Sequence, residues 1–118
     1  MTAPLLVREV VPATLEAADL SEPEGRAWLA TRYHREGAYV RLNMITALTG
    51  GAVGPDGTSE TLTSRVDRTI LGVIRSDADA YVVGAETVRA EKLPRPRSGT
   101  LVVVTRHPGL ATSAPALA

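Results

Sequence analysis

The sequence predicts an α/β fold built on parallel strands. Between Tyr39 and Glu91 a β-rich run, a glycine-rich loop, a helix, a second strand and a Gly-Ala-Glu-Thr-Val-Arg turn follow in that order. The core must come from valine, leucine, isoleucine and alanine, because the 118-residue chain has no phenylalanine. Such a composition suits buried parallel strands covered by helices. Three strands with an intervening helix make a right-handed parallel βαβ arrangement the default topology.

Length and composition exclude several functions. The chain is long enough for one domain, and its 13 basic and 13 acidic residues give no net charge, so we expect no nucleic-acid partner. The absence of cysteine excludes disulfides and thiolate chemistry and favours a cytoplasmic location. No apolar run approaches the ~20 residues of a membrane helix, and the first residues lack a signal-peptide pattern. His34 and His107 are far apart, so we expect no metal site.

Residues 1–37 are predicted to form an extension with one helix over about residues 22–36. Ser21 followed by Glu24 has the spacing of a capping box, and Gly37 stands where a left-handed C-cap is expected. Trp28 and Tyr33 are interpreted as packing residues rather than a base-stacking pair. The preceding run LLVREVV is either a short strand or an arm that contacts a partner.

From Ala38 to Leu48 the pattern predicts a strand, with Val40, Leu42 and Met44 on one face. Its other face carries Arg41 and Asn43, so it either faces a site or belongs to a solvated edge strand. The strand ends at Thr49 and two glycines, and GPDG at 54–57 is a turn sequence in which Gly57 tolerates positive φ.

The next helix is the best specified element. Ser64 can cap it with Asp67 three residues on, and apolar residues recur on its buried side at Val66, Ile70, Val73 and Ile74. Hydroxyl groups gather before it, at Thr58, Ser59, Thr61, Thr63 and Ser64. These groups suggest a phosphate cradle at a helix N-terminus, and simple capping and turn chemistry is an equal alternative. Arg75 could merely complement the helix C-terminus.

The last part of the chain predicts two more strands. Ala80 to Val83 is an apolar strand that breaks at Gly84, Glu86 to Glu91 is a brief helix, and LVVV at 101–104 is a strand of the same kind. They are joined by the loop KLPRPRSG, whose basic residues we interpret as solvated. After Thr105 the composition is that of a connector.

Four segments together resemble a known family. VRLNMITALTG, GPDGTSETLTS, RVDRTILGVIR and ADAYVVGAETVRAE are similar, in order and spacing, to the N-terminal half of the reductase domain of riboflavin biosynthesis. The resemblance covers residues 38–105 and implies a dihydrofolate-reductase-like, three-layer fold with a mostly parallel sheet. Residues 38–118 would then hold the N-terminal half of that domain, truncated after about three strands, because the family domain continues for roughly as many residues again.

The resemblance also implies an activity. Members of this family reduce 5-amino-6-(5-phosphoribosylamino)uracil, or its diaminopyrimidine counterpart, to the ribitylamino product with NADPH. The sugar opens to an imine-like form and receives hydride from the nicotinamide, while the protein mainly positions the reactants. The phosphorylated ribosylamino-pyrimidine is the expected partner, and a homodimer is possible.

Site residues follow from the same resemblance. Ser59 and Arg75 fall where the family holds its substrate, and the positions that match contacts to the cofactor are Ile45, Thr61, Thr87 and Glu91. No catalytic residue is assigned. The chain departs from the family where a Ser-Leu-Asp-Gly-like strand end is replaced by ALTG at 47–50, so that Thr49 stands in place of a carboxylate. Two alternatives therefore stay open: a catalytically silent α/β binding or assembly module, and a paralogous NADPH reductase of another small substrate.

Overall fold

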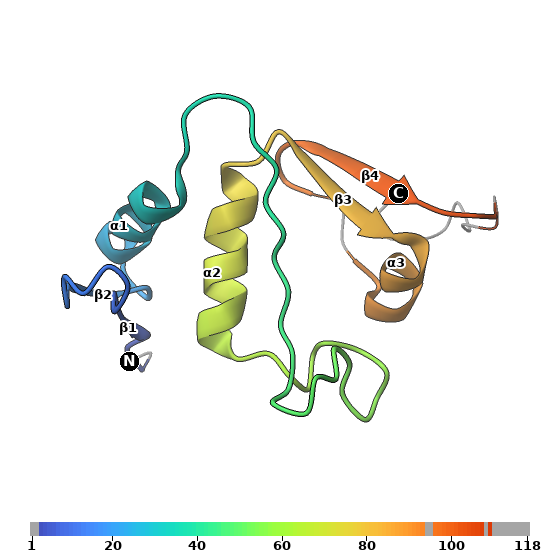
Figure 1. Ribbon diagram of the computed structural model, residues 1–118, viewed down its shortest axis with the longest axis horizontal. Coiled ribbons are helices and arrows are strands. Elements are labelled where there is room, and N and C mark those ends of the chain that lie inside the picture. Colours follow the sequence, from blue (N-terminus) through green and yellow to red (C-terminus); the bar gives the residue numbers. More distant parts are fainter. Residues whose placement is uncertain (1–2, 94–95, 108, 110–118) are drawn as a thin grey trace. The chain divides into compact units, whose positions relative to one another are not determined.

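The computed structural model describes residues 3–93, 96–107 and 109 (Figure 1). The chain forms two compact units. The first unit consists of Met1–Asn43 and Ser64–Asp77, and the second of Met44–Thr63 and Ala78–Ala118. Both helices and strands are present along the chain, which confirms the α/β class. The predicted division into residues 1–37 and 38–118 stays a prediction.

A small antiparallel sheet opens the first unit. Strand β1 (Leu6–Arg8) pairs with β2 (Ala17–Asp19), with Leu6 opposite Asp19. The strand alternative for LLVREVV is thus confirmed. The Asp19 carboxylate ends this sheet, because Oδ1 accepts hydrogen bonds from the Leu5 amide at 2.8 Å and from the Ser21 amide and hydroxyl at 2.9 and 2.7 Å.

Helix α1 (Pro23–Tyr33) begins differently from the sequence prediction. Its N-cap is Glu22, whose side chain makes no capping hydrogen bond, so the predicted Ser21 cap is wrong. The helix begins one residue later than predicted, with proline in its first turn, and the Ser21 hydroxyl donates to Asp19. The helix ends at the C-cap His34, and Gly37, with φ of 76°, forms a separate turn beyond it.

Helix α2 (Arg65–Ser76) forms with the predicted cap and belongs to the first unit. Ser64 is the N-cap, and its Oγ accepts the Asp67 amide at 3.2 Å. Helix α1 contacts both β2 and α2, and the buried apolar side chains of this unit are Leu20, Leu29 and Ile74.

The strand predicted over Ala38 to Leu48 is not formed. Residues 38–46 run without regular secondary structure, and Val40, Leu42 and Met44 are exposed, the last two to 85% and 67%. A strand needs a neighbour that takes its backbone hydrogen bonds, and no described segment pairs with this one. The predicted third strand is therefore missing from the sheet, although the turn that follows is present, with the Gly50 amide donating to the Ala47 carbonyl at 2.9 Å.

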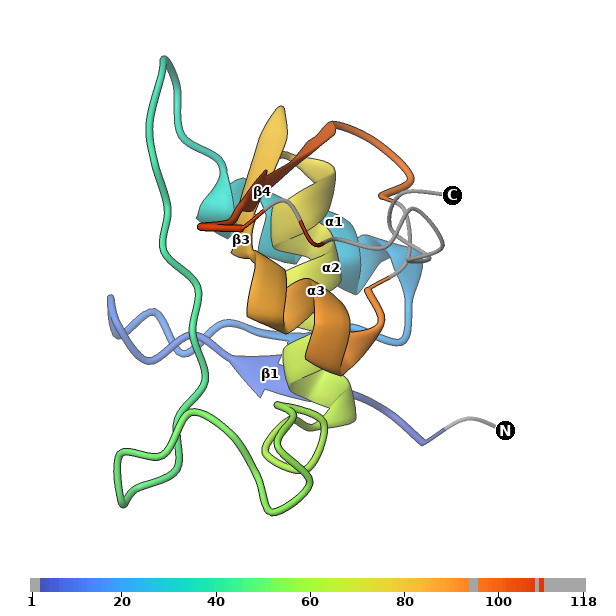
Figure 2. The same ribbon diagram turned by 90° about the vertical axis from the view of Figure 1, so that its right-hand side faces the viewer.

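The second unit contains the parallel pair. Strand β3 (Ala80–Gly84) lies beside β4 (Thr100–Val104), with Ala80 opposite Thr100 and Gly84 opposite Val104. Helix α3 (Ala85–Glu91) follows β3 directly and contacts both strands (Figure 2). Its buried residues, Ala85 and Val88, form the core there. A parallel pair joined through a helix is confirmed, while the three-layer arrangement with a mostly parallel sheet stays a prediction.

Two further expectations concern the rest of the chain. Arg95 and most of the connector predicted after Thr105 lie outside the described residues. Among the described helices, none has the length and apolar character needed to cross a membrane.

Candidate functional site

A tight turn shapes the loop that carries Ser59 and Thr61. The Gly57 amide donates to the Gly54 carbonyl at 3.0 Å, and the Gly54 amide donates to the Thr58 carbonyl at 2.8 Å. Gly57 has φ of 76°, which glycine adopts at little cost. The predicted GPDG turn is therefore confirmed, and it fixes the direction in which residues 58–61 leave it.

Asp56 organises the hydroxyl groups of this loop. Its Oδ2 accepts the Thr58 hydroxyl at 2.8 Å, and its Oδ1 accepts the Thr58 amide and the Thr61 hydroxyl, each at 3.1 Å. Gly54 makes room for this contact, because a Cβ there would lie 1.5 Å from Thr61 Oγ1. We read Asp56 from the sequence only as a turn residue. Its position two residues before a threonine is the available signal for such a side-chain turn.

Glu91 joins the same loop to α3. Its Oε1 accepts the Ser59 hydroxyl at 2.6 Å and the Ser59 amide at 3.2 Å. Both residues are half-buried. Two positions that are 32 residues apart in the sequence are thereby brought into direct contact, and each of them is a predicted site residue.

Helix α3 holds Glu91 and Thr87 in a fixed relation. The two residues are four positions apart, so their side chains lie on one side of the helix. Thr87 is exposed, whereas Ala85 and Val88 are buried and hold the helix in place. Because α3 starts at the carboxyl end of β3, Thr87 lies where α/β sheets commonly bind ligands.

The structure thus brings two predicted residues, Ser59 and Glu91, into direct contact. Thr61 lies two residues from Ser59 on the loop and Thr87 lies four residues before Glu91 on α3, and we call these four residues the Ser59–Glu91 cluster. Ile45 belongs to the same unit and is half-buried. Arg75 lies in the last turn of α2, in the first unit, and is half-buried. Thr49 is exposed in the turn after residue 47, and threonine cannot supply the charge of the carboxylate that the family has there.

The protonation of Asp56 offers a direct test of the loop. Hydrogen bonds from the Thr58 hydroxyl, and then from the Thr58 amide, lower the pKa of Asp56. Because the pKa is lowered, the stabilisation is complete above the ordinary carboxyl pKa and is lost as the pH falls through the lower folded value. We expect Thr58→Val to raise the Asp56 pKa more than Thr61→Val does, measured by carboxyl-carbon NMR titration. A larger effect of Thr61→Val would contradict this geometry.

His34 belongs to the first unit. His34 Nδ1 is 3.3 Å from Asp77 Oδ1, and the Tyr39 hydroxyl donates to Asp77 Oδ2 at 3.1 Å. The hydrogen bond with His34 is the main cause that lowers the pKa of Asp77. This contact ties the ends of α1 and α2 together. Within the described parts of the chain, no three histidine, cysteine or acidic residues are grouped as metal ligands would be.

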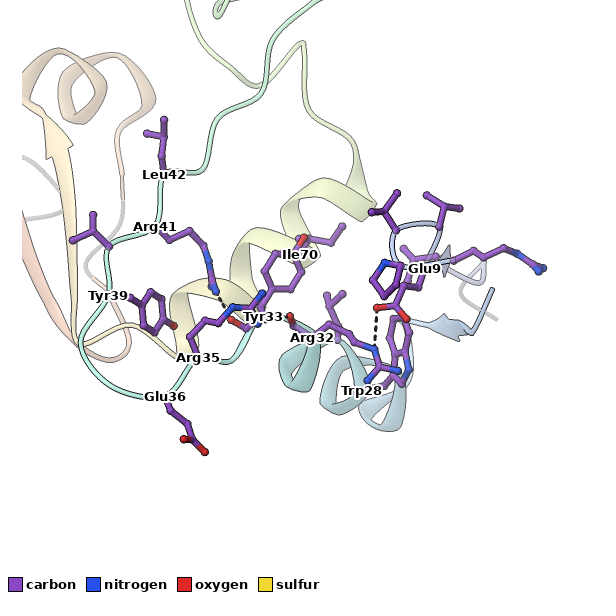
Figure 3. A pocket seen from close by; sticks show the side chains of 17 residues that line it. Glu9, Trp28, Arg32, Tyr33, Arg35, Glu36, Tyr39, Arg41, Leu42 and Ile70 are labelled. Carbon is purple, nitrogen blue, oxygen red and sulfur yellow. Dashed lines mark hydrogen bonds and ion pairs between the residues drawn. The ribbon is translucent and has the colours of Figure 1, made fainter. Parts of the chain in front are cut away.

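The first unit also has an open groove of about 1000 Å³ (Figure 3). Its guanidinium groups are held in place. Arg32 lies 4.9 Å from the centre of the Trp28 ring and pairs with Glu9 at 3.2 Å, while Arg41 donates to the Tyr33 carbonyl and lies 5.2 Å from the Tyr33 and Tyr39 rings. None of the predicted site residues lines this groove. We therefore place the candidate site at the Ser59–Glu91 cluster, whose side chains combine hydroxyl and carboxylate chemistry.

The fold and the cluster define an α/β domain with a polar site beside a parallel strand pair. Residues 38–114 match the family model of the RibD C-terminal domain, so the chain belongs to this family. The family is one of riboflavin-biosynthesis reductases, and its members generally bind NADPH. All six predicted site residues fall within the match. No curated protein and no solved structure matches the chain.

Proposed function

We propose that this chain is an NADPH-dependent reductase of riboflavin-biosynthesis type. Its substrate would be 5-amino-6-(5-phosphoribosylamino)uracil or its diaminopyrimidine counterpart, and its product the ribitylamino compound. The observation that carries the proposal is the family match over residues 38–114. The contact between Ser59 and Glu91 supports it, because it joins a residue assigned to the substrate with one assigned to the cofactor.

The residues of the second unit fit a dinucleotide. Glu91 uses Oε1 for Ser59, and among the described residues Oε2 has no hydrogen-bond partner, so Oε2 can accept a ribose hydroxyl. Thr87 is exposed one helical turn away and Thr61 follows on the loop. We assign the cofactor to these three residues and to the backbone near Ile45. When bound, NADPH supplies the hydride.

Two residues are assigned to the substrate. Ser59 is held by Glu91, which sets the direction of its hydroxyl group. Arg75 supplies a permanent positive charge, and a charge-assisted hydrogen bond from its guanidinium would hold the phosphate or a pyrimidine oxygen. The protein then contributes mainly by positioning the two reactants. A homodimer is part of the proposal and is tested by the mass of the purified protein in solution.

Turnover is the direct test of this function. The purified chain is mixed with NADPH and the ribosylamino-uracil phosphate, and the loss of reduced nicotinamide is followed together with the formation of the ribitylamino product. We expect oxidation that requires the substrate. NADPH binding without turnover would favour the catalytically silent module, and turnover only with other small substrates would favour the paralogous reductase.

Glu91 provides a prediction with a matched control on the same helix. We expect Glu91→Ala to weaken NADPH binding about tenfold or more, because a hydrogen bond to a charged group contributes about 1.5–3 kcal/mol. Glu86 is also on α3, but its carboxylate pairs with Arg89 at 3.3 Å and its side chain is 90% exposed, so Glu86→Ala should leave the affinity unchanged. Fluorescence titration measures both. Equal affinities of the two variants would remove Glu91 from the cofactor site.

A further inference from the structure

The groove of the first unit runs along one edge of the small antiparallel sheet. Val7 and Arg8 of β1 both line it, whereas none of the β2 residues Ala17–Asp19 does. Consecutive side chains of a strand point to opposite faces, so a groove that both residues line follows the edge of the strand rather than one face of the sheet. This is the edge of β1 that faces away from β2.

The backbone of β1 is unpaired at this edge. The Glu9 amide donates to the Glu16 carbonyl at 2.8 Å, and the residue before it, Arg8, stands opposite Ala17. Bonded and non-bonded pairs alternate in an antiparallel ladder, so the amides and carbonyls of Arg8 and Leu6 point away from β2. In the described chain the sheet has two strands. Such an edge is a template on which another extended chain can pair.

The groove is cationic, although the chain as a whole has no net charge. Glu9 pairs with Arg32 at 3.2 Å, and Glu36 points away from Tyr33 and Arg41 (Figure 3). A positive charge of +2 remains on the lining, which has two glutamates, Glu9 and Glu36, and four arginines, Arg8, Arg32, Arg35 and Arg41. This charge opposes the same groove of a second copy and favours an acidic occupant.

Two of these guanidinium groups are fixed at the end of α1. Arg41 donates to the Tyr33 carbonyl, and Arg35 donates to the His34 carbonyl at 2.8 Å and to the Arg32 carbonyl at 3.3 Å. These bonds stabilise the end of the helix. A guanidinium has several N–H donors in a fixed fork, so donors remain for a carboxylate, which can accept two parallel bonds.

We infer that this groove binds an acidic segment of a partner protein, which adds to β1 as a third strand. The backbone of the segment pairs with Leu6 and Arg8, in the manner of strand addition to a sheet edge. Its side chains alternate, because a residue opposite Val7 should be apolar and one opposite Arg8 acidic. Further carboxylates bind Arg35 and Arg41.

The inference is independent of the proposed reductase activity. Most of the groove is formed by residues that precede the family match at residues 38–114, and no residue assigned to substrate or cofactor lines it. It gives a role to the segment LLVREVV, whose strand the reductase chemistry does not use. Loss of the reductase activity would leave this binding surface in place, and loss of the binding surface would leave the reductase proposal in place.

A short synthetic peptide in which valine alternates with glutamate is the probe, titrated into the full chain. Trp28 is the only tryptophan of the chain and lines the groove, so its fluorescence reports occupancy. We expect a saturable change in fluorescence and slower hydrogen exchange at the Leu6 and Arg8 amides. A peptide with lysine in place of glutamate should not bind. No binding of the glutamate peptide, or equal binding of both peptides, would overturn the inference.

A backbone-methylated peptide separates strand pairing from attraction between charges. N-methylation of the glutamate peptide leaves its carboxylates in place and removes the N–H groups that pair with a strand edge. We expect this peptide to bind about tenfold more weakly, because several backbone hydrogen bonds are lost. Equal affinity of the methylated and unmethylated peptides would reject the added strand.

Substitution of the arginines tests the acidic end of the segment. We expect Arg41→Gln and Arg35→Gln each to weaken binding of the glutamate peptide about tenfold, as for loss of a hydrogen bond between charged groups. Arg26→Gln is the matched control, because its guanidinium donates to the Leu20 and Ser21 carbonyls, each at 2.9 Å, and does not line the groove. Amide spectra of α1 show whether each variant is folded. An unchanged affinity in both groove variants, or an equal loss in Arg26→Gln, would overturn the inference.

Discussion

Replacing Gly25 by alanine is expected to lower the free energy of unfolding of the first unit by about 3 kcal/mol, near the upper end of the usual cost of overpacking. A Cβ at this position would lie 1.9 Å from the Asp19 carbonyl oxygen and 2.5 Å from its carbon. These are backbone atoms, which cannot rotate away as a side chain would. The Asp19 carbonyl also accepts the Glu22 amide at 3.1 Å, so a shift would disturb the start of α1.

Gly72→Ala is the matched control, because it makes the same change in the other long helix of this unit. A Cβ at Gly72 meets nothing within 4 Å, and alanine is favoured over glycine inside a helix by about 0.8–1.0 kcal/mol. We therefore expect a small gain in stability. Urea unfolding followed by amide signals of α1 and α2 compares the two variants. Equal changes in both would contradict the close contact at Gly25.

Gly99→Ala is expected to have the largest effect in the second unit, a loss of about 2–4 kcal/mol from backbone strain and overpacking together. Gly99 has φ of 73°, and a Cβ there would lie 2.7 Å from the Ala78 carbonyl oxygen and 3.0 Å from that of Asp79. The next amide, Thr100, donates to the Asp79 carbonyl at 2.9 Å. The substitution therefore disturbs the chain at the point where β4 begins to pair with β3.

We expect Gly99→Ala to affect the candidate site as well. Helix α3 carries Thr87 and Glu91 and packs on β3 and β4, so loosening the strand pair should weaken NADPH binding as well as stability. The control variant Gly57→Ala separates the effect of backbone strain from the effect of a steric clash. Gly57 also has positive φ, but a Cβ there would meet nothing within 4 Å. We expect Gly57→Ala to lower the free energy of unfolding by about 1–2 kcal/mol, which is the cost of the left-handed conformation alone. Hydrogen exchange of the β4 amides measures the stability of both variants. An equal loss of stability in the two would show that the steric clash at Gly99 is absent.

Elements with local determinants could be predicted well. The cap of α2 uses Ser64 and Asp67, three positions apart, and the GPDG turn closes on itself between Gly54 and Gly57. The short apolar runs at β3 and β4 indicate buried strands. Their parallel pairing follows from the helix between them. In each case the partners of a hydrogen bond are near neighbours in the chain, or the topology leaves one arrangement.

The failures have a common cause. At Ser21 the capping pattern was present, but the helix begins one residue later and the Ser21 hydroxyl donates to the Asp19 carboxylate. At residues 38–46 the alternation of a strand was present, but no described segment accepts its backbone hydrogen bonds. A sequence pattern states what a segment can do. Competition from an acceptor nearby, or the absence of a pairing strand, then decides whether it does so.

For the candidate site, the amino-acid sequence by itself determined which residues are assigned to it, through the family resemblance, and that hydroxyl groups would gather on residues 58–61. The tertiary structure decided which way those hydroxyls point, because the acceptor for Ser59 is Glu91, 32 residues away. The direction of a hydroxyl proton depends on the nearest strong acceptor in space.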